Sequence, residues 1–322
     1  MPICCNKGKI VLRYGLAICF LLLLLSRAAA ATLAEPASGA EEPLAALSEL
    51  LVAPSGQLIE EKRQLDRKQS LRPLALVSHR PNYLLGSYYF IKPQTTPFEE
   101  QFPEEDVQIN PVELKFQLSL KTLLVSDLIG KTGDLWVGYT NRSFWQALNS
   151  KRSSPFRETN HEPEFWFDFA ADLPLGSVHF KGANFGMVHQ SNGQWGEVSR
   201  SWNRLYGLFI FEHESFSFTV RPWWRLPESR STDDNPDIEK YLGNFEFYAL
   251  KNWNRQSLGI MLRNNLNFNN NNHGAVQVDY TFPLHNQLRG YLQYFSGYGE
   301  SLIDYDHEVQ TLGFGVMLSN WL

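Results

Sequence analysis

The chain has 322 residues, of which 43% are hydrophobic, 14% aromatic and 20% charged, and its formal net charge is -5. This composition is too apolar for a disordered chain, while a mean hydropathy of -0.30 is too polar for a bundle of membrane-spanning helices. The sequence has no basic stripe, so nucleic acid is not an expected partner.

Residues 1–30 have the organisation of a secretory signal peptide. Basic Lys7, Lys9 and Arg13 precede the apolar run 16–25, and the small residues 28–30 supply a cleavage site. The run is too short to span a bilayer, which takes about 20 residues as a helix. All three cysteines lie in this segment, so we expect a mature chain without disulfides. Removing the segment takes away four basic residues and no acids, which changes the net charge from -5 to -9.

Residues 31–80 differ from the rest of the chain. They begin rich in Ala, Glu, Pro and Ser and continue into the charged stretch 60–68. We expect a periplasmic N-terminal extension here, mobile or locally helical, followed by the folded domain over residues 81–322. The mature sequence has no apolar run near eighteen residues, which argues against a membrane-spanning helix.

From about residue 81 onward, apolar and polar residues alternate with the period of a β-strand. Phe165, Phe167 and Phe169, for example, alternate with positions that include Glu164 and Asp168. About twelve such runs are separated by polar or Gly-, Asn-, Asp- and Pro-rich turns. They start near Tyr83, Val112, Leu135, Pro163, Val178, Trp202, Phe216, Tyr241, Gln256, Val276, Leu288 and Thr311.

Two all-β architectures fit this pattern, a soluble barrel or sandwich and an outer-membrane barrel. The runs of ten or more residues match a tilted bilayer span rather than the shorter strands of soluble proteins. Aromatic residues gather near the ends of the runs, as in interfacial girdles, and the chain stops within the strand-like run 314–322. We therefore predict a transmembrane β-barrel of the outer membrane.

A group of polar residues is expected on the outer wall of this barrel. His189 and Ser191 lie two residues apart, so they share one face of a strand. Phe185 has the same parity, which indicates that this face points toward lipid. A hairpin turning near Gly196 would bring Asn203 opposite residue 189, because antiparallel partners have nearly constant index sums.

Such a placement favours a catalytic triad. Unpaired polar groups in an apolar medium cost on the order of 2 to 7 kcal/mol each, so the three side chains should bond to one another. His189 would then be the general base for Ser191, and Asn203 would fix the orientation of the imidazole. A neutral Asn suits a site beside lipid, where a buried carboxylate costs more. From spacing alone, simple decoration of the membrane interface is the alternative.

Blocks of sequence around and beyond these three residues form a specific combination: HQSNG at 189–193, SRSWNRLY at 199–206, SSPFRETN at 153–160, TDDNPD at 232–237 and SGYGESLIDY at 296–305. In these blocks the chain resembles the outer-membrane phospholipase A family, from about residue 81 to its C-terminus.

The resemblance implies a twelve-stranded antiparallel barrel in the bacterial outer membrane, with its active site on the outer wall. Such enzymes hydrolyse the acyl esters of phospholipids and lysophospholipids, require Ca²⁺ and act as homodimers. Carried over by residue, Ser191 is the nucleophile, His189 the base and Asn203 its orienting group. The backbone N–H of Gly193 would help to hold the oxyanion.

The resemblance also implies a Ca²⁺ site shared by two subunits. A loop serine of one subunit matches Ser153, while a hydroxyl and a backbone carbonyl of the other match Ser199 and Gln194. Gly196 stands where some family members have an acid, which leaves an additional Ca²⁺ site open. Asp234 could contribute to such a site, and a solvated Asp/Asn turn is the other interpretation.

Asn141 matches a polar position of the dimer interface that is usually Gln. The shorter amide would weaken the pairing of subunits. Two barrels side by side would form a cleft lined by lipid-facing apolar residues, in which acyl chains could lie, so we expect a monomer to be nearly inactive.

Two other functions stay open at this stage. A porin or structural barrel would have no reason to place a Ser, a His and an Asn on its outer wall, and a soluble binding barrel would extract without detergent. Charges on the lumen face are expected to form a polar network that plugs the barrel, as for Arg204, Glu212, Glu164 and Asp168. The other histidines, His79 and His161 among them, lack ligand spacing and are interpreted as surface residues.

Overall fold

The computed structural model describes residues 58–70, 75–129, 133–150, 155–229, 231–285 and 288–319. The expected signal peptide and the first part of the expected extension lie outside this part of the chain, so both stay predictions. Within the described ranges, no helix is long and apolar enough to cross a membrane.

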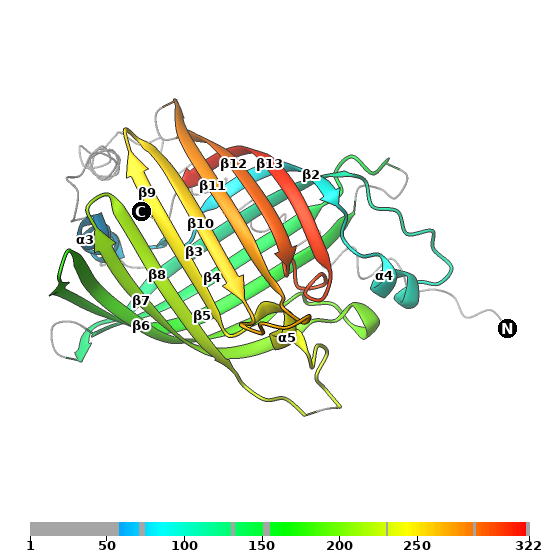
Figure 1. Ribbon diagram of the computed structural model, residues 1–322, viewed down its shortest axis with the longest axis horizontal. Coiled ribbons are helices and arrows are strands. Elements are labelled where there is room, and N and C mark those ends of the chain that lie inside the picture. Colours follow the sequence, from blue (N-terminus) through cyan, green and yellow to red (C-terminus); the bar gives the residue numbers. More distant parts are fainter. Residues whose placement is uncertain are drawn as a thin grey trace, which may run out of the picture. The chain divides into compact units, whose positions relative to one another are not determined.

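Twelve long antiparallel strands form a closed barrel (Figure 1). Each strand pairs with the next one in the chain, and the last pairs with the first, which closes the sheet. A further two-residue strand, β1 (Val77–Ser78), pairs with β3. The long strands are β2 (Asn82–Ile91), β3 (Val112–Ile129), β4 (Gly133–Trp145), β5 (Phe156–Leu175), β6 (Val178–Ser191), β7 (Ser201–His213), β8 (Phe216–Arg225), β9 (Phe245–Trp253), β10 (Gln256–Asn264), β11 (Gly274–His285), β12 (Leu288–Tyr298) and β13 (Glu308–Ser319).

Most strands begin within three residues of the position that the alternation predicts, but two do not. β5 starts at Phe156 rather than near Pro163, because the charged side chains of Arg157 and Glu158 hide the strand pattern while they point into the barrel. Tyr241 lies in the short helix α5 (Ile238–Leu242), and β9 begins only at Phe245. The twelve-stranded all-β barrel is confirmed.

The outer wall is apolar and the lumen is polar, as an outer-membrane barrel requires. Exposed large apolar side chains cover the outside, among them Leu84, Leu118, Phe165, Phe185, Leu205, Trp224, Ile260, Leu312 and Phe314. Inside, buried charges pair with one another: Arg80 Nη1 lies 3.0 Å from Glu162 Oε2, and Lys115 Nζ lies 3.0 Å from Glu300 Oε1. These paired charges form the expected polar network in the lumen.

Helix α3 (Leu58–Ser70) completes this network at the end of the barrel with the short turns. Glu60 and Glu61 stand in its first turn and Arg67 and Lys68 in its last, which suits the helix dipole. Arg63 Nη2 donates to Asp168 Oδ1 at 3.0 Å, and the Leu58 N–H donates to Glu212 Oε1 at 3.1 Å. Two of the predicted lumen acids, Asp168 and Glu212, therefore bind the helix. Part of the segment expected as an extension is thus packed on the barrel.

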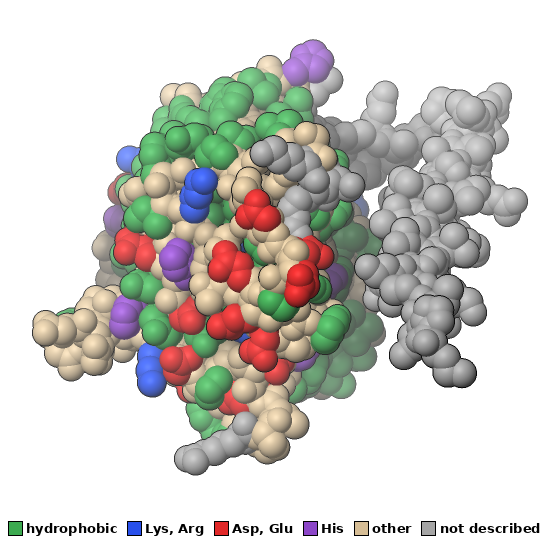
Figure 2. All heavy atoms as spheres, turned by 90° about the vertical axis from the view of Figure 1, so that its right-hand side faces the viewer, with side chains coloured by type: hydrophobic (Ala, Val, Ile, Leu, Met, Phe, Trp, Pro, Cys, Tyr) green, Lys and Arg blue, Asp and Glu red, His purple; other side chains and the backbone are tan. Residues whose placement is uncertain are grey.

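The opposite end of the barrel carries the longer loops and the small helices α4 (Thr96–Gln101), η2 (Gly196–Val198) and α5. Barrels of the outer membrane have short periplasmic turns and longer external loops, so this end faces outward. Many Asp and Glu side chains and few Lys or Arg gather on it (Figure 2).

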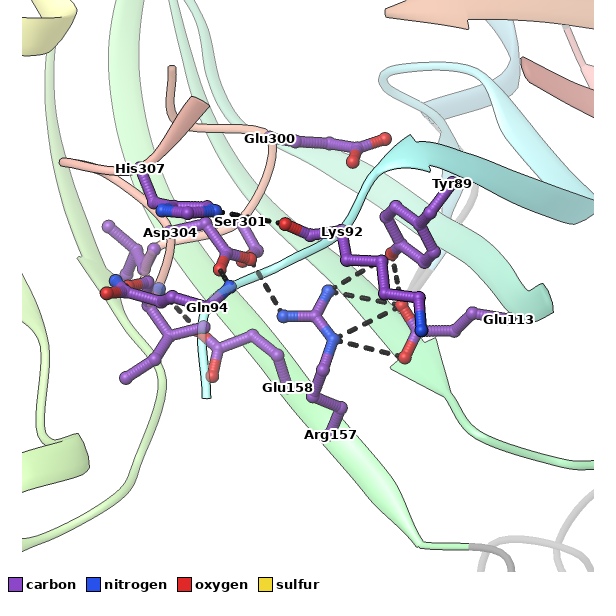
Figure 3. Close-up of polar contacts among 12 residues, drawn as sticks. Tyr89, Lys92, Gln94, Glu113, Arg157, Glu158, Glu300, Ser301, Asp304 and His307 are labelled. Carbon is purple, nitrogen blue, oxygen red and sulfur yellow. Dashed lines mark hydrogen bonds and ion pairs between the residues drawn. The ribbon is translucent and has the colours of Figure 1, made fainter. Parts of the chain in front are cut away.

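A buried ion cluster lies beneath these loops, with Arg157 at its centre (Figure 3). Arg157 Nη2 lies 3.1 Å from Glu113 Oε2, and Arg157 Nη1 lies 2.8 Å from Asp304 Oδ2. The hydroxyl of Tyr89 also bonds to Glu113. The cluster ties β2, β3 and β5 to the loop between β12 and β13, which stabilises the outer end of the barrel.

Candidate active site

The strands β6 and β7 position the predicted triad. Their pairing places His189 directly opposite Asn203, and Ser191 directly opposite Ser201. Val188 and Trp202 are fully buried toward the lumen. Because side chains alternate along a strand, the residues on either side of them point outward. His189, Ser191 and Asn203 therefore face outward, as the alternation of the sequence predicted.

His189 and Asn203 form a hydrogen bond across the two strands. The imidazole Nδ1 lies 2.9 Å from the amide oxygen Oδ1. Since an amide oxygen only accepts, Nδ1 carries the proton and Nε2 keeps its lone pair. The structure brings Ser191 to the same face, two residues along β6, but within the described residues no hydrogen bond joins it to His189. Catalytic contacts of this kind are commonly loose before substrate binds.

The loop between β6 and β7 is held by one buried side chain, that of Asn192. Its Nδ2 donates to the carbonyl of Val198 at 2.7 Å, while its Oδ1 accepts the N–H of Gln194 at 3.2 Å and that of Arg200 at 3.0 Å. Nδ2 also approaches Glu158 Oε2 at 3.3 Å, next to the Arg157 cluster. Sequence reasoning missed this residue, although an Asn before a Gly is a familiar turn signal.

Gly193 directly follows Asn192 and has a backbone φ of +63°. Only glycine adopts this left-handed conformation without strain. A Cβ at this position would meet the ring of His161 at 3.8 Å, so the space above the backbone is open and faces that histidine. Gly193 therefore lies two residues after Ser191, and its missing side chain leaves open space between its backbone and the ring of His161.

Two of the expected Ca²⁺ ligands are adjacent. Ser199 Oγ donates to Asp234 Oδ2 at 2.7 Å, which joins the β6–β7 loop to the β8–β9 loop. Gln194 lies in the same β6–β7 loop, whereas Ser153 lies outside the described residues. In the part of the chain that the structure describes, no group of three or more His, Cys, Asp or Glu could hold a metal.

The β8–β9 loop is fixed on both sides of Asp234. Asp233 Oδ1 lies 2.6 Å from Arg225 Nη2, and the buried Asn235 accepts the N–H of Ser201 through Oδ1 at 3.0 Å. Further along, Tyr305 donates to Asp237 Oδ1 at 2.7 Å. Burial and this carboxylate raise the pKa of Tyr305, so its hydroxyl stays a donor. Asp234 is thus held next to Ser199 by its neighbours.

Comparison with known proteins decides the family. The family model described as phospholipase A1 matches residues 59–318, most of the chain. The chain belongs to the phospholipase A1 family. The match begins earlier than the resemblance over residues 81–322 suggested, and it includes helix α3.

Individual members of the phospholipase A1 family are similar to this chain over most of its length and of theirs. The phospholipase A1 of Proteus vulgaris is 37% identical over 248 residues, which is 77% of this chain and 83% of that protein. The crystal structure of the Salmonella typhi outer membrane phospholipase dimer with bound calcium is 35% identical, with a TM-score of 0.72, and covers 78% of this chain and 94% of that one.

A solved structure of the Escherichia coli outer membrane phospholipase A is 32% identical, with a TM-score of 0.72, over 80% of this chain and 98% of that one. It is an active-site mutant in which an asparagine is replaced by alanine. The predictions of family, barrel fold, outer-membrane location and enzymatic nature are confirmed for this chain.

Two further polar residues of this chain lie next to the predicted triad on the outer wall. Asn141, on β4, is directly paired with His161 on β5, and its Nδ2 lies 3.5 Å from His161 Nδ1. His161 is in turn directly paired with Ser191 on β6. His161 lies on the outer surface, as expected, but the register of β5 with β6 places it opposite Ser191, a neighbour that the spacing of the histidines did not indicate.

His79 was also interpreted as a surface residue, and that was wrong. Its ring stacks on Trp166 with centroids 4.6 Å apart, and its Nε2 lies 2.9 Å from Glu164 Oε1 in the lumen. This histidine belongs to the polar network inside the barrel and not to the active site.

Proposed function

We propose that this outer-membrane phospholipase hydrolyses the acyl esters of phospholipids and lysophospholipids through a triad of Ser191, His189 and Asn203 on its outer wall. The observation that carries the proposal is the 2.9 Å contact between His189 Nδ1 and Asn203 Oδ1 on a lipid-facing surface, with Ser191 on the same face. An asparagine also belongs to the active site of the Escherichia coli relative.

In the first half of the reaction, Ser191 Oγ forms a bond to the ester carbonyl carbon while its proton passes to His189 Nε2. The π electrons of the carbonyl move to its oxygen, and the N–H of Gly193 donates to that oxyanion. When the electrons return, the bond to the glycerol oxygen breaks and the leaving oxygen takes the proton from His189. The products are a lysophospholipid and an acyl-serine.

In the second half, water replaces the glycerol oxygen. It gives a proton to His189 as its oxygen bonds to the acyl carbon, and Ser191 Oγ leaves and recovers that proton. A free fatty acid is released. Asn203 keeps Nδ1 protonated throughout, so Nε2 is the nitrogen that exchanges protons with Ser191 and water.

The oxygen atoms near Gly193 suit Ca²⁺, which prefers oxygen ligands. Ser199, the carbonyl of Gln194 and Asp234 would hold the ion, with Ser153 contributed by a second subunit. Bound Ca²⁺ supplies Lewis-acid polarisation of the ester carbonyl. Support comes from the 2.7 Å contact of Ser199 with Asp234 and from the calcium in the Salmonella typhi dimer.

We propose further that the active form is a homodimer. Asn141 lies on the outward face of β4 among apolar side chains, where it would face its copy in a second subunit. The Salmonella typhi relative is a dimer. Two apposed outer walls would create an apolar cleft for acyl chains and would complete the Ca²⁺ site.

The test is release of fatty acid by refolded protein in detergent, with Ca²⁺ and with a chelator. Wild type is compared with Ser191→Ala and with Ser215→Ala, a control in a periplasmic turn. We expect activity only with Ca²⁺ and only when Ser191 is present. Equal activity of Ser191→Ala would contradict the triad, and equal rates for a cross-linked dimer and a monomer-locked variant would contradict the dimer proposal.

A further inference from the structure

Ser191 has a second histidine beside it. His161 on β5 is the direct register partner of Ser191 on β6. Directly opposite side chains on antiparallel strands have Cβ atoms only about 4.5–5.5 Å apart. Since Ser191 points outward and its partner shares that face, the nucleophile is flanked by His161 across the strand and by His189 along it.

The partners of His161 fix the position of its proton. Nδ1 lies 2.6 Å from the hydroxyl of Tyr139 and 3.5 Å from Asn141 Nδ2. The amide of Asn141 is oriented by Ser143, whose hydroxyl donates to Oδ1 at 3.0 Å. An amide NH₂ group only donates, so the Asn141 contact makes Nδ1 of His161 the acceptor, and its single lone pair is shared with the hydroxyl of Tyr139. Neutral His161 therefore carries its proton on Nε2.

The two histidines thus have opposite tautomers. His189 has an acceptor, Asn203 Oδ1, at its Nδ1, so its Nε2 has a free lone pair. His161 has donors at its Nδ1, so its Nε2 is an N–H donor. A free lone pair is what a general base needs, and an N–H is what an oxyanion needs. The chemistry of the partners therefore separates the two rings into different roles.

The imidazole of His161 lies beside the backbone of Gly193. The ring atoms nearest to a Cβ built on Gly193 are Cδ2 and Nε2 of His161, at 3.8 and 3.9 Å. Gly193 is the residue whose backbone N–H we assign to the oxyanion. A carbonyl oxygen bound at this backbone, with its carbon at Ser191, would lie in the open space between the Gly193 amide and His161 Nε2.

We infer that His161 is a catalytic residue that donates a hydrogen bond from Nε2 to the ester carbonyl oxygen, as a second oxyanion donor beside the Gly193 N–H. This inference rests on the proposed triad. Neither proton transfer nor a covalent bond involves His161. Tyr139 and Asn141 position the ring, so the dimer-interface residue Asn141 also contributes to the alignment of the oxyanion site.

The kinetic test compares His161→Phe, which removes the N–H, with His161→Gln, whose amide can still donate. His179→Phe, at the periplasmic end of β6, is the matched control. Removal of one oxyanion donor costs on the order of 10²–10³ in kcat. We expect His161→Phe to lose about a hundredfold in kcat with KM within about threefold, and His161→Gln to regain about tenfold of that loss. The acid limb of the kcat/KM profile should persist in His161→Phe.

A kcat of His161→Phe within twofold of wild type would overturn the inference. Loss of the acid limb would also overturn it, because it would make His161 the base.

A second measurement does not depend on the folding of variants: ¹⁵N NMR of the wild-type imidazoles in micelles. We expect Nε2–H for His161 and Nδ1–H for His189, and the Nδ1–H tautomer at His161 would contradict the proposal. If Ser191→Ala kept full activity, the triad and this inference would fail together. If Ser191→Ala lost activity while His161→Phe kept it, the role of His161 would be overturned and the triad would stand.

Discussion

His189 and Asn203 face each other at directly paired positions of β6 and β7, with the imidazole Nδ1 2.9 Å from the amide oxygen. The pair lies on the outer wall, where the exposed neighbours are Phe185 and Leu205. Because its amide is neutral, Asn203 can hold the imidazole without the free-energy cost of placing a carboxylate beside lipid.

Asn203→Ala should lower kcat by about a hundredfold or more, because the imidazole loses the group that selects its tautomer. KM should change little, since Asn203 has no role in binding the substrate. The matched control is Asn252→Ala at the periplasmic end of β9, which should keep wild-type kinetics. An Asn203→Ala variant with full kcat would show that another group orients His189.

Gly193→Ala should lose activity through its backbone. Both Gly193 and Gly176 have left-handed φ values, +63° and +70°, so alanine strains either position by about 1–2 kcal/mol. Gly176 has no atom within 4 Å of a built Cβ and lies in the periplasmic turn between β5 and β6. Equilibrium unfolding should therefore show similar losses for the two variants, while fatty-acid release should fall only for Gly193→Ala. Equal activity of the two variants would argue against Gly193 as an oxyanion donor.

Asp234→Asn and Ser199→Ala should each raise the Ca²⁺ concentration needed for half-maximal activity, by about tenfold, because each removes an oxygen ligand or its charge. At saturating Ca²⁺ both should approach the wild-type rate. Asp306→Asn, an exposed acid on the same outer face, controls for the general loss of negative charge. A Ca²⁺ titration of hydrolysis measures the shift. Unchanged midpoints in both variants would remove these residues from the site.

Arg63→Ala should destabilise the barrel without changing catalysis. Arg63 joins α3 to Asp168 at 3.0 Å and to the carbonyl of Lys181, and its side chain is 15% exposed. Removing Arg63 leaves Asp168 without its charged partner in a mostly buried place, which costs about 1–3 kcal/mol. Urea unfolding in lipid measures the loss, and Glu60→Ala on the same helix is the control. No loss of stability would indicate that α3 is not part of the cooperative fold.

The sequence by itself determined the strands and the faces of their side chains. Alternation is a local property, because each side chain points to the opposite side from its neighbour. The parity of Phe185 with His189 and Ser191 was therefore enough to predict the lipid-facing position. The turn centred on Gly196 was enough to predict that Asn203 lies opposite His189.

Only the tertiary structure decided which residues of other strands meet the predicted triad. Leu175 pairs with Val178 at the turn between β5 and β6, and this register would continue to place His161 opposite Asn192. A shift between Ala170 and Leu173 moves the pairing by one residue, so His161 meets Ser191 instead. A bulge of this kind leaves no clear mark in the alternation, because the extra residue is absorbed by a local kink.

Contacts made by loops and helices could not be predicted from the sequence either. Asp234 and Ser199 are 35 residues apart. They meet because Asp233 binds Arg225 on β8 and Asn235 binds Ser201 on β7, which fixes the β8–β9 loop against both strands. Helix α3 was expected as part of a separate extension, yet it binds Asp168 and Glu212 inside the barrel. Such contacts depend on which surfaces the closed barrel brings together, and closure is a property of all twelve strands at once.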